Sequence, residues 1–177
     1  MDNEIIFFWI VQSLGIIGLI FYGVSFQMKT KEKLLLVQVM SNIFVTVQFL
    51  LLMALTGAVQ TLIGVIRGIV FYFFKKKDLK PNIAVLIIFE IAIILGTVFT
   101  WENILSILPL IGMTVNLYGQ WQDNMKTVRI CAIISGVLWS IYAFNTGVYT
   151  AVLNEILKIS SSLIGLWRYR KINETQK

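Results

Sequence analysis

Four ionisable residues stand inside long apolar stretches of this sequence: Arg67, Glu90, Glu155 and Lys158. If these stretches lie in a membrane, each charge costs roughly 2.5–3.5 kcal/mol to insert, so it is expected to face a cavity or another charge. Glu90 stands alone in its stretch, so we expect it to pair locally or to reach the membrane surface, and a role in proton coupling stays open.

The other three charges form a candidate site. Glu155 and Lys158 are three residues apart, a spacing that brings side chains together on one face of a helix. Arg67 lies at a similar depth in a different apolar stretch, so we predict a buried charged cluster in which Arg67 pairs with Glu155. Such a cluster either holds two parts of the protein together or contacts a polar solute.

Uncharged polar residues in the same stretches extend this candidate site. Asn154 precedes Glu155, at a depth where a polar group facing lipid would be wasteful. Asn42 and Asn116 are further candidates, although membrane-embedded asparagine also hydrogen-bonds between helices for packing alone. Trp139 lies deep in an apolar stretch and either stacks on a sugar or base ring or packs between helices. The predicted substrate-binding residues are therefore Asn154, Glu155, Arg67, Lys158, Asn42, Asn116 and Trp139.

Composition argues against several other chemistries. The sequence is 58% hydrophobic and 14% charged, with a mean hydropathy of +0.82, whereas about 25% of residues are charged in soluble domains. It has no histidine and one cysteine, Cys131, so we expect neither a disulfide nor a transition-metal site. It lacks the motifs of nucleophile elbows and phosphate-binding glycine loops, so we expect no enzyme, no catalytic residue and no cofactor. The net charge is +6, but the basic residues form no continuous face with aromatic residues between them. We therefore expect no nucleic-acid partner.

The distribution of Lys and Arg predicts how the chain is threaded. All but two of the 15 fall in four clusters, at residues 29–33, 75–80, 126–129 and 168–177. Cytoplasmic loops of membrane proteins hold the excess of Lys and Arg. Placing all four clusters in the cytoplasm predicts an all-α polytopic protein with its N-terminus outside, seven crossings and its C-terminus inside. The predicted crossings are Ile5–Phe26, Leu34–Leu55, Ala58–Phe74, Ile83–Thr100, Ile104–Trp121, Val128–Phe144 and Tyr149–Trp167.

Short motifs recur at matching places in the two halves of this plan. Tyr22-Gly23 ends the first crossing and Tyr118-Gly119 ends the fifth, and Met-Lys-Thr follows each pair closely. Thr56-Gly57 is predicted to join the second and third crossings, as Thr146-Gly147 joins the sixth and seventh. Two three-helix units that both begin outside and end inside are parallel repeats. A single helix between them must return the chain to the outside, so that the second unit can start there. We therefore predict one membrane domain, residues 1–177, in a 3+1+3 plan: repeat 1 at 5–75, a linker helix at 83–100 and repeat 2 at 104–171.

This plan resembles that of the SWEET sugar transporters, the PQ-loop proteins and the PnuC vitamin-precursor transporters. The segment 22–27, Tyr-Gly-Val-Ser-Phe-Gln, with the Lys-rich loop and Asn42 after it, is most similar to YgjV, a bacterial inner-membrane family. In SWEET-like proteins an asparagine on the third helix of each repeat lines the substrate site, and the resemblance gives this role to Asn154. SWEET and PQ-loop proteins also place a proline in the first helix of each repeat. Pro109 has that place in the second repeat, and Ser13 stands at the matching position of the first.

Other polar or small residues receive lesser roles. We expect Gln48 and Gln60, nearer the outer end of their crossings, to line a vestibule. Gly64 is taken as the counterpart of Asn154 in the first repeat, so that one side of the site offers hydrogen-bonding groups and the other offers room. Ser160–Ser162 are expected to permit close approach between helices.

Together these features predict a bacterial inner-membrane transporter, either a facilitator or a proton-coupled carrier. Its solute would be a small polar molecule such as a sugar, a nucleoside or a vitamin precursor, bound between the repeats and released by alternating access. The alternative is a non-transporting receptor or assembly factor of the same fold, which would expose its polar residues in one water-facing vestibule. The expected partners are the solute and the lipid bilayer, and a homo-oligomer stays open.

Overall fold

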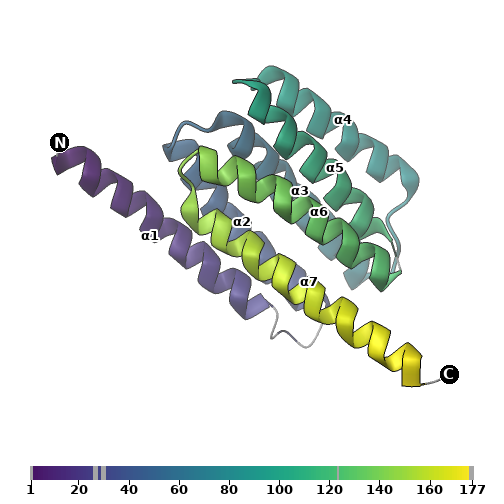
Figure 1. The fold of residues 1–177 in the computed structure, drawn as a ribbon. Helices are drawn as coiled ribbons and strands as arrows, with labels where there is room; N and C mark the ends of the chain where they lie inside the picture. Colours follow the sequence, from purple (N-terminus) through teal and green to yellow (C-terminus); the bar gives the residue numbers. More distant parts are fainter. Residues whose placement is uncertain (1, 26–27, 29–30, 123, 176–177) are drawn as a thin grey trace.

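The computed structural model describes residues 2–25, 28, 31–122 and 124–175 of the chain. These residues form helices and turns with no strand among them, so the predicted all-α fold is confirmed (Figure 1). The helices are α1 (Asp2–Ser25), α2 (Lys31–Leu51), α3 (Leu55–Lys76), α4 (Ile83–Phe99), the short 3-10 helix η1 (Ile104–Ser106), α5 (Ile107–Trp121), α6 (Met125–Asn145) and α7 (Tyr149–Thr175).

Among the described residues, four segments are long and apolar enough to cross a membrane: Glu4–Ser25, Leu55–Lys76, Ile104–Trp121 and Met125–Asn145. The apolar parts of α2 and α4 are shorter, at Leu35–Leu51 and Ile83–Phe99. About 17 residues is the lower limit for a helix that crosses the roughly 30 Å hydrocarbon core. Four of the seven predicted crossings thus meet the criterion of length and composition, and the crossings by α2, α4 and α7 stay predictions.

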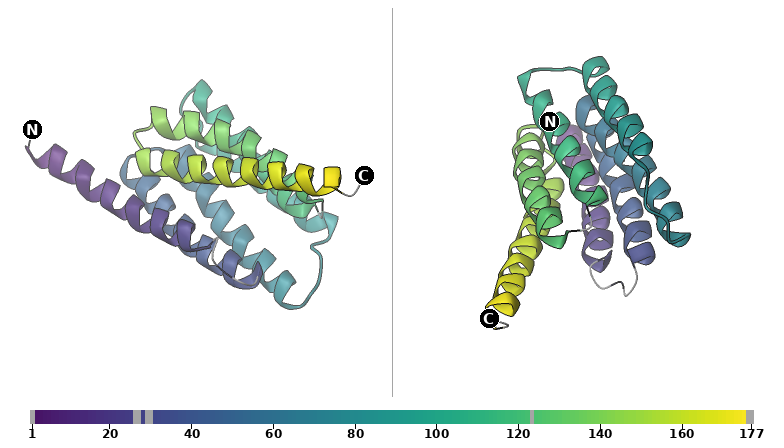
Figure 2. Two further views of the ribbon diagram at one scale, coloured as in Figure 1. Left: turned by 60° about the horizontal axis from the view of Figure 1, so that its bottom comes forward. Right: turned by 90° about the vertical axis from the view of Figure 1, so that its right-hand side faces the viewer.

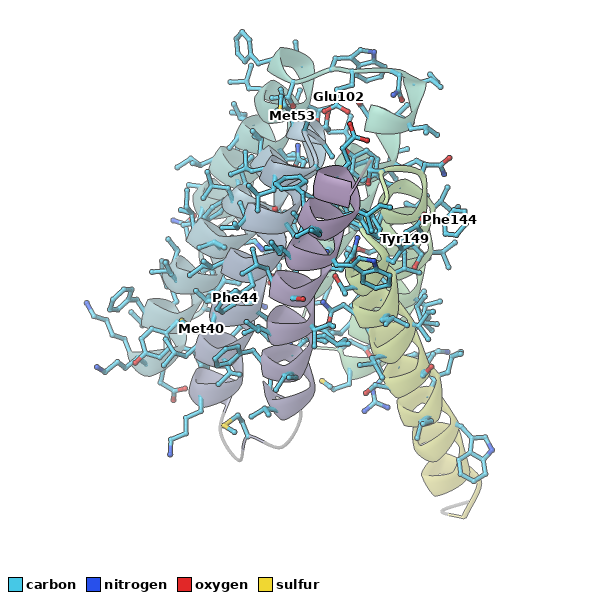
Figure 3. The ribbon with its side chains drawn as sticks, turned by 90° about the vertical axis from the view of Figure 1, so that its left-hand side faces the viewer. Met40, Phe44, Met53, Glu102, Phe144 and Tyr149 are labelled. Carbon is cyan, nitrogen blue, oxygen red and sulfur yellow. The ribbon has the colours of Figure 1, made fainter. Side chains whose placement is uncertain are left out.

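Large apolar side chains cover the outside of the helices. Phe99 is 82% exposed, and Met53, Phe144 and Tyr149, labelled in Figure 3, are exposed as well. Soluble monomers rarely expose contiguous apolar surface beyond a few hundred Å². An outer surface of this kind fits the acyl chains of a bilayer, and it leaves the polar residues of the helices to gather inside.

Six of the helices close into a ring. α2 packs between α1 and α3, and α6 packs between α5 and α7. The ring closes because α3 also contacts α5 and α1 also contacts α7, while α4 contacts α3 and α5. Figures 1 and 2 show the two termini at opposite ends of the molecule, with the last turns of α7 extending beyond the other helices. We call the end at which α1, α3, α5 and α7 finish the basic end, and the other the opposite end.

The predicted basic clusters belong to the basic end where the structure describes them. Lys75 and Lys76 occupy the last turn of α3, and Lys126 lies in the first turn of α6. Helix α6 begins behind Asn124, whose side chain accepts a hydrogen bond from the Lys126 amide at 2.9 Å, the usual capping arrangement. Lys29, Phe26 and the side chains of residues 168–177 lie outside the described part of the chain.

The turn between α2 and α3 differs from the prediction. Helix α2 ends at Leu51 and α3 begins at Leu55, so Thr56-Gly57 lies within the first turn of α3 and does not join the two helices. The true turn is a Schellman motif, in which Ala54 N donates to Phe49 O at 3.0 Å and Met53 takes the left-handed conformation, φ +57°. The sequence contains no signal for this turn, because the left-handed position is occupied by methionine and is usually occupied by glycine.

The turn between α6 and α7 is as predicted. Thr146-Gly147 joins the two helices, and Gly147 has φ +76°. Val148 N donates to Ala143 O at 2.9 Å, which completes the same Schellman motif as in the first half. Because this turn carries the glycine that its backbone requires, the sequence alone was enough to place it.

Candidate functional site

A cavity of about 850 Å³ lies within the ring of helices. Residues from all six ring helices line it, and α4 contributes none within its described span. The seven predicted site residues, Asn154, Glu155, Arg67, Lys158, Asn42, Asn116 and Trp139, all line this one cavity. The structure therefore brings them together, and their binding of a solute stays a prediction.

The cavity opens at the basic end. Its lining includes Asp78, Leu79 and Lys80, exposed residues of the connection between α3 and α4. Lys75 donates to Asp78 at 2.9 Å, and this hydrogen bond holds the pKa of the Asp78 carboxyl below its usual value. Lys80 lies over the Trp121 ring, 5.2 Å from its centroid. The mouth of the cavity therefore has a polar, mainly basic rim.

Aromatic packing closes the cavity towards the opposite end. Phe49 of α2 lies against Trp139 and Tyr142 of α6, with ring centroids 6.0 and 5.8 Å away. Phe49 and Tyr142 are almost fully buried. Gly57 of α3 packs so closely that a Cβ there would come within 2.7 Å of both rings. Trp139 therefore forms part of a closed aromatic layer, which we define as Phe49, Trp139 and Tyr142, and also faces the cavity.

Hydrogen bonds between helices reinforce this closure. Thr150 Oγ1 donates to Gln48 Oε1 at 2.7 Å, and Gln48 Nε2 donates to Gln12 Oε1 at 3.0 Å. Gln12 Nε2 in turn donates to the carbonyl of Gly147 at 2.7 Å, so α1, α2 and α7 are joined. On the other side of the ring, Gly57 N donates to Tyr142 Oη at 2.9 Å and joins α3 to α6.

The prediction that Gln48 and Gln60 line a vestibule is wrong. Both side chains are fully buried, and neither lines the cavity. Gln60 Nε2 donates to Ile93 O and to Thr97 Oγ1, each at 2.7 Å, and so fastens α4 to α3. A buried amide must satisfy its donors within the protein, and a neighbouring helix supplies the acceptors here.

Arg67 is 5% exposed and projects into the cavity from α3. Its Nη2 donates to Asn116 Oδ1 of α5 at 3.2 Å. Its Nε and Nη1 are buried and have no hydrogen-bond partner among the described residues. Asn116 also receives a hydrogen bond from Gln120 at 2.9 Å and donates to Ser135 at 3.4 Å. Arg67 is therefore held by one neutral acceptor, which it shares.

Arg67 does not pair with Glu155, contrary to the prediction. Glu155 forms an ion pair with Lys158, three residues further along α7, and both side chains are largely buried. Arg67 follows the start of α3 by about twelve residues, whereas Glu155 follows the start of α7 by about six, a difference of roughly 9 Å along a helix. With the third crossing predicted to begin at Ala58, the two depths matched only to within about one turn of helix.

The remaining predicted residues have different surroundings. Asn154 is 7% exposed, lines the cavity, and its Oδ1 has no hydrogen-bond partner among the described residues. Asn42 is half-buried and lines the cavity from α2. Glu90 lies outside it and accepts a hydrogen bond from Thr114 of α5 at 2.6 Å, so it pairs locally but with a neighbouring helix.

Several residues that sequence reasoning assigned elsewhere also line the cavity, among them Arg129, Ser161 and Ser162. Arg129 was counted with the basic clusters, and its guanidinium packs where a Cβ on Gly165 of α7 would lie. The serines were assigned to helix packing. A periodic analysis of the faces of α6 and α7 could have found them, since residues three or four apart share a face. Within the described part of the chain, no group of His, Cys, Asp or Glu could hold a metal ion.

Comparisons with known proteins identify the family of the chain. No curated protein and no solved structure matches the chain. The Imp-YgjV family model, described as a bacterial inner membrane protein, matches residues 9–173, a range that contains every residue of the site. The chain therefore belongs to the Imp-YgjV family of bacterial inner membrane proteins.

Proposed function

We propose that this protein is a transporter for a small polar solute, which works by alternating access between two parallel three-helix repeats. The observation that carries the proposal is the cavity of about 850 Å³. It holds buried polar side chains from both halves of the chain, opens at one end and is closed at the other. A binding site between repeats, reached from one side at a time, is the arrangement on which secondary transport depends.

Matching turns support the repeat architecture. Met53 and Gly147 each take the left-handed conformation in a Schellman motif, and each is followed two residues later by the start of a long helix, at Leu55 and Tyr149. These turns give a structural alignment of the halves that differs from the motif-based one, since Thr56 now aligns with Thr150. The halves consist of α1, α2 and α3 and of α5, α6 and α7, with α4 between them.

Contacts between the halves follow the same alignment. With Met53 placed on Gly147, Gln48 of α2 aligns with Tyr142 of α6. Gln48 accepts from Thr150, in the first turn of α7, and Tyr142 accepts from Gly57, in the first turn of α3. Equivalent helices thus make equivalent contacts across the ring, as a pseudo-two-fold axis requires.

The alignment also changes the counterpart of Asn154. Gln60 now takes that place, and Gly64 does not. Gln60 donates to Ile93 and Thr97 of α4 and lies outside the cavity, whereas Asn154 lines the cavity with an oxygen that has no partner among the described residues. The linker helix packs on α3 and α5, so the two repeats become chemically different at this position. Of these two counterparts, only Asn154 can contact a solute in the cavity.

The conformation fits one of the two states of a transport cycle. The positive-inside rule places the basic end in the cytoplasm, with the N-terminus outside and the C-terminus inside. The cavity then faces the cytoplasm, and the aromatic layer separates it from the outside. In the other state we expect the layer to open and the basic end to close.

Labelling of single cysteines tests alternating access without knowledge of the solute. In a Cys131→Ser background, Ala151→Cys places a thiol at the closed end of the cavity and Ser161→Cys places one nearer its mouth. We expect a membrane-impermeant maleimide to label the Ala151→Cys variant from either side of oriented vesicles, but the Ser161→Cys variant from the basic side only. Labelling of both variants from one side alone would contradict transport and favour a receptor with a fixed cavity.

A further inference from the structure

We propose that the solute carries an oxyanion, a carboxylate or a phosphate, and that Arg67 binds it. The inference rests on the proposed function, since it names the chemical class of the solute at the same cavity. The first observation is the state of the guanidinium. Arg67 is 5% exposed, and its Nε and Nη1 have no partner among the described residues. A buried charge without an acceptor is costly, so this arrangement calls for a ligand.

The chemistry of arginine selects that ligand. A guanidinium presents five N–H donors in a planar fork and accepts nothing. Carboxylate and phosphate oxygens match this fork with two parallel hydrogen bonds, which are stronger than those to a neutral acceptor. Asn116 engages Nη2 alone, at 3.2 Å. The donors that remain suit an oxyanion better than a sugar hydroxyl, which would leave the charge uncompensated.

No described carboxylate neutralises Arg67. Glu155 is paired with Lys158, and Asp78 is paired with Lys75. The described residues that line the cavity include five basic side chains and two acidic ones. A cavity with such an excess has a positive potential, which concentrates anions at its entrance and inside.

There is space beside Arg67 for the oxyanion. Gly64 precedes it by one turn of α3 and also lines the cavity. A Cβ on Gly64 would meet only Met113 Cε, at 3.6 Å, so no side chain crowds this face. Asn154 belongs to the deeper part of the cavity, by its position near the start of α7, and its free Oδ1 can accept a hydrogen bond from an uncharged part of the same solute.

Binding of simple oxyanions to the purified full-length protein tests the proposal. The probes are inorganic phosphate and succinate, with glucose as the uncharged probe and short-chain phosphatidylglycerol as the lipid probe. Affinity is measured by titration calorimetry in a neutral detergent, and the shift in melting temperature serves as a second readout. We expect phosphate or succinate to bind and Arg67→Gln to weaken binding about tenfold or more, as the loss of charge-assisted hydrogen bonds implies.

Two further variants make the test specific. Arg67→Lys keeps the charge and is expected to bind more weakly than the original protein, because lysine lacks the planar fork. Lys126→Gln also removes one positive charge, but from an exposed side chain at the basic end that does not line the cavity, so it should leave the affinity close to the original. Equal affinities of all these variants, binding of glucose alone, or no binding of either anion would overturn the proposal. Binding of the lipid alone, if it depends on Arg67, would overturn it too, by assigning Arg67 to a lipid headgroup.

The result is independent of the labelling experiment on Ala151→Cys and Ser161→Cys. Oxyanion binding is an equilibrium property of the cavity, whereas labelling from both sides requires the cavity to change its access. Two-sided labelling without oxyanion binding would leave transport in place and refute the class of solute. Oxyanion binding with one-sided labelling would refute transport and leave the chemistry of Arg67 in place.

Discussion

Arg67 and Asn116 join α3 to α5 inside the cavity through one hydrogen bond, from Nη2 to Oδ1 across 3.2 Å. The acceptor is neutral and is shared with Gln120, whose Nε2 lies 2.9 Å from the same oxygen. The bond therefore orients the guanidinium without balancing its charge. A guanidinium that is oriented at the cavity wall but has no counter-charge is suited to bind an anion. When no anion is bound, its uncompensated charge lowers the stability of the folded protein.

The first prediction concerns that cost. Arg67→Met should leave the ligand-free protein as stable as the original or stabilise it by about 1 kcal/mol, because it removes a poorly compensated buried charge. The measurement is thermal unfolding in detergent, in a buffer that contains chloride as its only anion. A large loss of stability would show that Arg67 is a structural residue with partners beyond Asn116.

The second prediction concerns the ion pair on α7. Glu155→Gln should destabilise the protein by about 2 kcal/mol, because Lys158 loses its charged partner in a largely buried place. Replacing both Glu155 and Lys158 by methionine should recover most of that loss. A double-mutant cycle measures the coupling, and additive effects would mean that the two side chains do not stabilise each other.

The third prediction concerns the aromatic layer. Gly57→Ala should cost about 1–3 kcal/mol, because the new Cβ would lie 2.7 Å from Phe49 and Tyr142 and would force the layer apart. It should also increase maleimide labelling of the Ala151→Cys variant from the outside. Gly23→Ala is the matched control, since nothing lies within 4 Å of a Cβ at Gly23. Similar labelling in the two variants would mean that the layer is not the barrier.

The fourth prediction separates binding from stability among the asparagines. Asn154→Ala should abolish solute binding with little loss of stability, because its Oδ1 bonds to nothing in the described structure. Asn116→Ala should lower stability by about 1 kcal/mol or more, because Asn116 bonds to Arg67, Gln120 and Ser135. Asn42→Ala should have a weaker effect on binding than Asn154→Ala. Calorimetry with an oxyanion that also carries hydroxyl groups, such as glycerol phosphate, and thermal unfolding give the two readouts. Normal binding of that probe by Asn154→Ala would show that Asn154 does not contact the solute.

The fifth prediction concerns orientation in the membrane. The termini lie at opposite ends of the molecule, and the basic end should face the cytoplasm (Figure 1). Alkaline phosphatase should therefore be active when it is fused to the N-terminus, and a fluorescent protein should fluoresce when it is fused to the C-terminus. Activity of alkaline phosphatase at both ends would exclude an odd number of crossings.

The sequence by itself determined the helical class and identified seven of the residues that line the cavity. Apolar stretches that end in basic clusters must form helices that hide their backbone from lipid, and this depends only on local composition. Polar residues within such stretches avoid lipid, so Arg67, Asn154 and their companions were expected to face inwards, and they line one cavity. The turn at Gly147 was also visible, because a residue with positive φ is usually glycine.

Only the tertiary structure decided which of these residues meet. Met53 takes a conformation that its side chain disfavours, so the start of α3, and with it the depth of Arg67, could not be read from the sequence. The partner of Arg67 is consequently Asn116 on α5, and Glu155 is left to Lys158. Gln48 and Gln60 found acceptors on α1 and α4, away from the cavity. Whether a side chain is buried follows from the hydropathy of its own segment. Which side chains pair depends on how far two packed helices are shifted along each other. That shift is set by the packing of helices that are distant in the sequence.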